Sequence, residues 1–235
     1  MTIIDPEREK RHQERVARSI EEREKRNYDP TLKPPEFYRD ADDTGIADLT
    51  YKPPWPKAPG WPHRTRLASH LIRSDEPVLE LGCGFGIMPA MLWHEGHRTA
   101  YTGWDFCQEA IDRAKQGNTD DGHQNTSWRA ADIDHPDTWN RLAIHLVEAP
   151  TRPVVVCCET LEHLEHDREL IEAIPSGTFC VFTVPQFWAI SHLRKFPTPD
   201  DAYERYGEFL DARYRLIAHY PNPNAGWVLI WGYRN

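Results

Sequence analysis

The chain has 235 residues, of which 28% are charged and 39% hydrophobic, and it carries a formal net charge of −9. This length is sufficient to bury a core, and the acidic balance argues against a protein that coats nucleic acid or an anionic membrane. The chain has no apolar run of about 18 residues and no signal-peptide core, so we expect a soluble, cytoplasmic protein without a membrane span. Its five cysteines form no CxxC pair, which argues against a zinc knuckle or a disulfide scaffold.

The first 62 residues differ in composition from the rest of the chain. Residues 5–26 hold 15 charged side chains of both signs, several of them in Glu-to-Arg or Glu-to-Lys pairs spaced i,i+4, which is typical of an exposed helix. Residues 30–62 contain eight of the 20 prolines, which favours extended backbone. We therefore expect an N-terminal helical and proline-rich extension, residues 1–62, and one folded domain, residues 63–235. The charged arm 5–26 could contact a partner or a second copy of the chain.

From His63 onward, short strand-like runs alternate with longer helix-like runs. The expected strands cover residues 77–81, 100–104, 127–130, 154–158 and 179–184, and the expected helices cover 63–73, 87–95, 107–116, 136–147 and 164–174. This alternation is typical of parallel β-α units. The last two apolar runs, YRLIAHY and GWVLIWGYR, are joined by PNPNA, which predicts a closing hairpin.

The segment VLELGCGFG places three glycines directly after a buried strand. Gly82, Gly84 and Gly86 permit a tight turn in which main chain can approach a ligand with no Cβ in the way. The chain then continues as a helix, with Gly96 at its expected end. Alone, this turn could be no more than a connection, but its position between a strand and a helix N-terminus is typical of a nucleotide site.

An acidic residue marks the end of each of the first three expected strands. Glu80 lies within the glycine motif, Asp105 ends the second strand and Asp132 ends the third. A carboxylate at the tip of the second strand can accept hydrogen bonds from both hydroxyls of a ribose, so Asp105 is the candidate for that role. Asp132 could accept from an adenine amino group while Phe106 and Ile133 pack on the faces of the ring.

These segments resemble the class I S-adenosylmethionine-dependent methyltransferases over residues 64–235. The resemblance rests on ELGCGFG, YTGWDF, AADI, CCETLEHL and the terminal hairpin. It implies a Rossmann-like α/β fold with a seven-stranded, mostly parallel sheet of order 3-2-1-4-5-7-6 and an antiparallel seventh strand. An NAD-dependent dehydrogenase, the nearest rival, would carry GxGxxG and continue with another parallel unit. The residues assigned to the cofactor S-adenosylmethionine are Glu80, Gly82, Cys83, Gly84, Gly86, Asp105, Phe106, Asp132, Ile133 and Glu159.

Methyl transfer from a sulfonium requires alignment of the acceptor and removal of its proton, so a base or a metal is needed near the cofactor. If a helix begins at Glu159, then Glu159, Glu162 and His163 lie on one face of it. His192, in the loop after the fifth strand, can approach the same crevice, because ligands of open α/β sheets bind where the strand order reverses.

This cluster allows two interpretations. It resembles the metal-binding set of the ubiquinone-pathway O-methyltransferases and of the small-RNA 2′-O-methyltransferases, in the latter of which two Glu and two His hold magnesium. Transferred to this chain, the set is Glu159, Glu162, His163 and His192, and Mg²⁺, Mn²⁺ or Zn²⁺ would be acceptable. The same pattern also occurs in class I methyltransferases without a metal, and in that case His163 or His192 would be the general base.

Two aromatic segments outside the sheet, residues 50–62 and 185–210, suit a planar or apolar small molecule, or could cover the core. Arg194 and Lys195 could hold a carboxylate or phosphate of the acceptor. The sequence therefore predicts O-methylation of a small hydroxylated acceptor, with a divalent metal as a further option. Two alternatives stay open: 2′-O-methylation of an RNA end, which the acidic charge disfavours, and a non-catalytic methyltransferase-like module for binding or assembly, which the intact glycine turn disfavours.

Overall fold

The computed structural model describes residues 61–120, 125–187, 192–220 and 222–235. Apart from its last two residues, the predicted extension 1–62 lies outside the described residues, and so do the charged arm 5–26 and Trp188 of the second aromatic segment. Among the residues that are described, no helix has the length and apolar character needed to cross a membrane.

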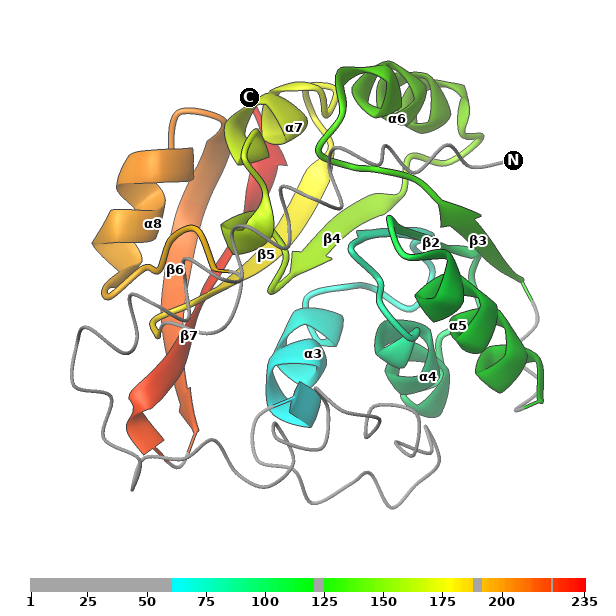
Figure 1. Cartoon of the computed structure of the whole chain (residues 1–235), viewed down its shortest axis with the longest axis horizontal. Coiled ribbons are helices and arrows are strands. Elements are labelled where there is room, and N and C mark those ends of the chain that lie inside the picture. Colours follow the sequence, from blue (N-terminus) through cyan, green and yellow to red (C-terminus); the bar gives the residue numbers. More distant parts are fainter. Residues whose placement is uncertain (1–60, 121–124, 188–191, 221) are drawn as a thin grey trace.

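A seven-stranded sheet forms the centre of the domain (Figure 1). Its strands are β1 (Val78–Leu81), β2 (Tyr101–Asp105), β3 (Thr126–Ala130), β4 (Val154–Cys158), β5 (Phe179–Pro185), β6 (Leu210–Tyr220) and β7 (Asn222–Arg234). They lie in the order β3-β2-β1-β4-β5-β7-β6, and β7 runs antiparallel to both of its neighbours. The predicted sheet order and closing hairpin are therefore confirmed, although β7 begins inside the segment that was predicted to be the turn.

Helices cover both faces of the sheet. They are α3 (Trp61–Ser69), α4 (Ile87–His94), α5 (Gln108–Asp120), α6 (Pro136–Glu148), the 3₁₀ turn η3 (Leu161–His163), α7 (Asp167–Glu172) and α8 (Pro199–Tyr206). In Figure 1, α3, α4 and α5 lie on one side of the sheet, and α6, α7 and α8 lie on the other. The sheet is thus the middle layer of three, as expected for alternating strands and helices.

Each face of the sheet has its own hydrophobic cluster, because successive side chains of a buried strand point to opposite faces. Leu79 and Leu81 of β1 pack with Leu142 of α6, whereas Val78 packs with Met88 of α4. All of these side chains are at most 2% exposed, and burying each one stabilises the fold by about 1.5–3 kcal/mol. The strands of the predicted motifs are therefore anchored from both sides.

The carboxyl ends of the parallel strands meet at one edge of the sheet. The chain leaves β1 towards β2 on one side, while β4 pairs with the other side of β1. The strand order therefore reverses between β1 and β4, and the loops after these two strands face each other. In open α/β sheets this is the position of the ligand crevice.

Candidate functional site

The three glycines after β1 have three different surroundings. All have positive φ, 76° at Gly82, 49° at Gly84 and 78° at Gly86, a region that side chains disfavour. A Cβ at Gly82 would lie 2.2 Å from Oγ1 of Thr160, and a Cβ at Gly86 would lie 2.6 Å from the Trp128 ring. A Cβ at Gly84 would meet no atom of the described residues within 4 Å. Gly82 and Gly86 thus permit close packing of the protein itself, and Gly84 is the glycine that opens on free space.

Asp105 lies beside this turn, as the sequence predicted. Its Oδ2 accepts a hydrogen bond from the Gly84 amide, and its Oδ1 accepts one from the Cys107 amide, both at 2.9 Å. The main chain therefore holds the carboxylate in place at the tip of β2.

Two other residues of the predicted cofactor set, Glu80 and Cys83, have buried side chains. Glu80 is buried, and its carboxylate accepts a hydrogen bond from the Tyr101 hydroxyl. Burial, followed by the charge of Glu80, raises the pKa of Tyr101 well above its ordinary value. The Cys83 thiol is buried against Gly103, and burial, followed by the charge of Glu80, raises its pKa. Both groups support the turn, so Cys83 could contact a cofactor only through its main chain.

The residues expected around an adenine ring differ in accessibility. Phe106 is 38% exposed, whereas Ile133 is 3% exposed and belongs to the core. Asp132 closes a local turn, because its Oδ1 accepts from the Asp134 amide at 2.9 Å. Phe106 therefore has an exposed ring surface, and Ile133 has very little.

Glu159 does not begin a helix, which corrects the prediction. Its φ is 52°, and its amide donates to the Thr183 carbonyl oxygen at 3.0 Å, so β4 stays attached to β5 at this point. The 3₁₀ turn η3 follows instead of an α-helix. Within the described ranges, the group whose potential ligand atoms lie within 4.8 Å of one another consists of Glu162, His163 and His192, without Glu159.

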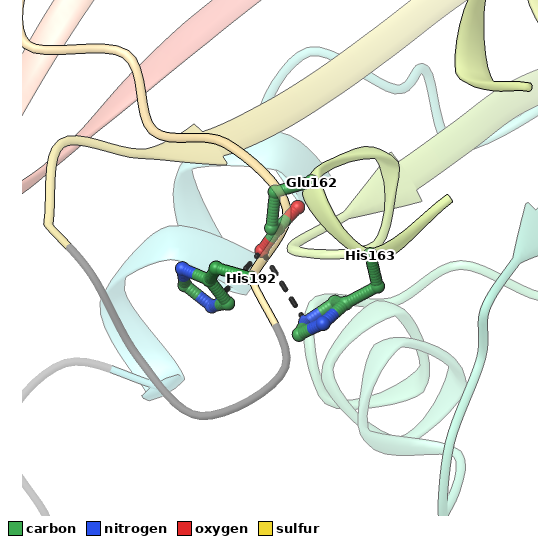
Figure 2. A group of neighbouring side chains, drawn as sticks. All are labelled: Glu162, His163 and His192. Atoms are coloured by element: carbon green, nitrogen blue, oxygen red, sulfur yellow. Dashed lines mark ion pairs between the residues drawn. The ribbon is translucent and has the colours of Figure 1, made fainter. Parts of the chain in front are cut away.

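Figure 2 shows the Glu162 carboxylate directed at both imidazole rings. Its Oε1 lies 3.7 Å from Nε2 of His163 and 3.7 Å from Nε2 of His192. Glu162 is fully buried, and the side chains of His192 and His163 are 6% and 33% exposed. The sequence-distant His192 is thus brought to η3, as predicted, and the more accessible ring is that of His163.

The second ring nitrogen of His192 fixes its orientation. Nδ1 lies 3.2 Å from the Phe187 carbonyl oxygen. Because a carbonyl oxygen can only accept, Nδ1 carries the proton, and in the neutral ring Nε2 keeps its lone pair on the side of Glu162. This tautomer suits either a base or a ligand.

Arg194 was expected to bind an anionic acceptor, but it points into the protein. Its Nη1 donates to the carbonyl oxygens of Leu161 and Leu164 at 2.8 and 2.7 Å and lies 3.1 Å from Oδ2 of Asp167. Of the aromatic side chains offered for the acceptor, Phe196 is a core residue at 3% exposure. Arg194 and Phe196 therefore belong to the protein's own packing.

Two buried polar groups near the end of β5 were not predicted. The Thr183 hydroxyl and the Trp227 indole N–H are buried and have no hydrogen-bond partner in the described part of the chain. Pro185 is paired with Trp227 in the sheet, so both groups lie on the same face of it. Sequence reasoning had no signal for these two groups, because a strand pattern shows which face is apolar and not which hydroxyl lacks a partner.

Comparison with known proteins agrees with this fold. Residues 79–176 match the family model described as a methyltransferase domain. Magnesium protoporphyrin IX methyltransferase from Synechocystis PCC 6803 with bound SAH is 12% identical, with 74% of this chain and 82% of that chain covered and a TM-score of 0.52. For StiE O-MT, residues 961–1257, the identity is 11%, the coverage 74% of each chain and the TM-score 0.53.

A third solved structure concerns the conversion of a disulfide bond into a thioacetal group during echinomycin biosynthesis. It is 17% identical, covers 74% of this chain and 82% of its own, and has a TM-score of 0.54. No curated protein matches the sequence. At these identities the solved structures show the fold, and the family model assigns the domain. Residues 79–176 therefore match a methyltransferase domain, and the described part of the chain has the Rossmann-like fold of the class I methyltransferases.

Proposed function

We propose that the protein methylates a hydroxyl group of a small acceptor, with His192 as the general base. The observation that carries this proposal is the geometry around His192: a ring with one fixed tautomer whose Nε2 faces a fully buried carboxylate at the strand-order reversal. Imidazole is the side chain best suited to accept a proton near neutral pH.

The glycine turn fits S-adenosylmethionine. Main chain at Gly84 can approach the methionine part, because the position of a Cβ there is free space. The fixed Asp105 carboxylate would accept from the ribose hydroxyls, and the exposed Phe106 ring would cover one face of the adenine. When bound, the cofactor supplies a methyl group carried on a sulfonium sulfur. The sulfur keeps the electron pair of the broken carbon–sulfur bond and becomes a neutral thioether.

The chain's own residues then have to move one proton. His192 Nε2 takes the proton of the acceptor hydroxyl while the acceptor oxygen forms its bond to the methyl carbon. Glu162 stabilises the resulting imidazolium, and the Phe187 carbonyl keeps the ring oriented. His163, the more exposed ring, would contact the acceptor. A general base of this kind contributes about 10²–10⁴-fold to the rate.

A divalent cation is a second candidate, because three potential donor atoms lie within 4.8 Å of one another. Two ligand atoms that are each about 2.1 Å from one ion can be up to about 4.2 Å apart, so the separations of 3.7 Å are compatible with a shared ion. Glu162, His163 and His192 would hold it, and it would lower the pKa of a bound hydroxyl. Two imidazoles and one carboxylate suit Zn²⁺ or Mn²⁺ better than Mg²⁺, which prefers oxygen ligands.

The test is transfer of labelled methyl groups from S-adenosylmethionine to a panel of small hydroxylated acceptors, with an RNA oligonucleotide included. His192→Gln should lower kcat by about 10²-fold or more and leave S-adenosylhomocysteine affinity unchanged, and His94→Gln, at the exposed end of α4, should leave both unchanged. Full activity of His192→Gln would reject the base. Loss of activity on chelation, restored by Mn²⁺ or Zn²⁺, would favour the cation, and undiminished activity would exclude it.

A further inference from the structure

The proposed base cluster is assembled from two segments that are distant in sequence. Glu162 and His163 lie in η3, whereas His192 lies in the loop after β5. The distance of 3.7 Å between Glu162 Oε1 and His192 Nε2 exceeds that of a good hydrogen bond. The Leu193 amide also donates to the Glu162 carbonyl oxygen at 2.8 Å, and the His163 and His192 rings pack edge to face with 4.8 Å between their centroids.

Arg194 adds two charged hydrogen bonds between the same two segments. It follows His192 by two residues, and its Nη1 donates to the carbonyl oxygens of Leu161 and Leu164, which flank Glu162 and His163 on either side. Donors that carry a charge form hydrogen bonds about twice as strong as neutral ones. A turn as short as η3 has few hydrogen bonds of its own, so the guanidinium holds both of its ends against the segment that carries His192.

Arg194 is itself held by a buried carboxylate. Asp167, fully buried at the start of α7, has its Oδ2 3.1 Å from Nη1 of Arg194. The same carboxylate accepts from Arg205 through two hydrogen bonds, at 2.7 and 2.6 Å, and from the Tyr206 hydroxyl at 2.7 Å. Arg205 thus shares the partner of Arg194, and its side-chain hydrogen bonds run to Asp167 and not to η3, which makes it a matched control.

We propose that Arg194 is a positioning residue that sets the separation between Glu162 and His192. It touches no reactant, and the inference rests on the proposed role of His192 as the base. The buried Asp167 carboxylate holds the guanidinium in place. The guanidinium in turn holds η3 in a fixed position relative to the loop after β5. A displacement of about 1 Å in such a pair can lower a rate by about 10²-fold.

The test compares Arg194→Gln with Arg205→Gln. We measure unfolding, the ¹⁵N chemical shifts of the His192 and His163 rings, S-adenosylhomocysteine affinity and methyl transfer. Arg205→Gln should destabilise the protein at least as much as Arg194→Gln, because it removes two bonds to a buried carboxylate, yet it should leave the ring signals and kcat near those of the wild type. Arg194→Gln should shift both rings and lower kcat about tenfold or more at unchanged cofactor affinity.

Arg194→Lys keeps the charge but lacks the planar fork, so it should give an intermediate kcat, and it replaces Arg194→Gln if that variant does not fold. Equal effects of the Arg194 and Arg205 variants on the rings and on kcat would overturn the proposal, as would unchanged ring signals in the Arg194 variants. The ring signals need no acceptor. The ¹⁵N shifts of the two rings therefore test the positioning role of Arg194 even if no methyl transfer to hydroxyl groups is found.

Discussion

Oδ2 of Asp105, at the end of β2, accepts a hydrogen bond from the amide of Gly84, in the turn after β1, at 2.9 Å. The bond joins the tips of two neighbouring strands within the protein itself. A site whose groups are already in place loses less entropy on binding. Asp105 therefore fixes the glycine turn, and in the proposed site it would also accept from the ribose.

Alanine substitutions at the glycines should separate packing from binding. In Gly82→Ala the new Cβ would lie 2.2 Å from Thr160 Oγ1, at a φ of 76°, and we expect the free energy of unfolding to fall by about 2–4 kcal/mol from strain and overpacking together. In Gly84→Ala the loss should be about 1–2 kcal/mol, from φ alone, while S-adenosylhomocysteine affinity falls at least about tenfold, or about 1.4 kcal/mol. Denaturant unfolding and calorimetry measure the two quantities.

Gly177→Ala is the control for this pair. Its φ is 77°, and its nearest atom to a new Cβ, Arg152 Nη1, is 3.5 Å away. It therefore has the same backbone strain without a place in the site. Binding of S-adenosylhomocysteine by Gly84→Ala as tight as that of Gly177→Ala would show that the free space at Gly84 is not the cofactor site.

Much of this site follows from the sequence, because glycine turns and strand-end acids are local patterns. The position of Asp105 at the turn is one example. The conformation of Glu159 is not local: its amide bonds to β5, and this tertiary contact overrides the helical spacing of Glu159 and Glu162. Arg194 shows the same limit, since a long side chain can turn inward to carbonyl groups about 30 positions away, and no periodicity reports that.

Thr183→Val should not destabilise the protein. The Thr183 hydroxyl is buried and has no partner within the described ranges, so it bears a desolvation cost without a hydrogen bond in return. We expect the free energy of unfolding to stay the same or to rise by up to about 1 kcal/mol. Denaturant unfolding measures this change.

Thr178→Val provides the comparison, because Thr178 is equally buried but its Oγ1 donates to the Pro175 carbonyl oxygen at 2.6 Å. This variant should lose about 1 kcal/mol or more. Equal losses in the two variants would mean that the Thr183 hydroxyl is satisfied after all.

Acid should weaken the fold in part through His97. Burial lowers the pKa of His97 below its ordinary value of 6.5, against the opposing charge of Glu95. The unfolded chain therefore takes up this proton more readily than the folded chain. The stabilisation is fully present above pH 6.5 and is lost as the pH falls through the lower pKa of the folded state. His145 acts in the same direction.

The free energy of unfolding should accordingly decrease between about pH 7 and pH 5, and His97→Gln should flatten that decrease. Urea unfolding at a series of pH values measures the slope, with His94→Gln as the control. A slope that His97→Gln leaves unchanged would show that another group carries the acid sensitivity.

The most direct test of the cofactor site is calorimetric titration of S-adenosylhomocysteine into the full-length protein. One binding site per chain is expected, and Asp105→Ala should weaken it by at least about tenfold, since a hydrogen bond to a charged group is worth about 1.5–3 kcal/mol. Asp75→Ala, which changes an exposed carboxylate paired with Arg73, should bind like the wild type. Absence of binding by the wild type, or unchanged affinity in Asp105→Ala, would contradict the assignment of this turn as the cofactor site.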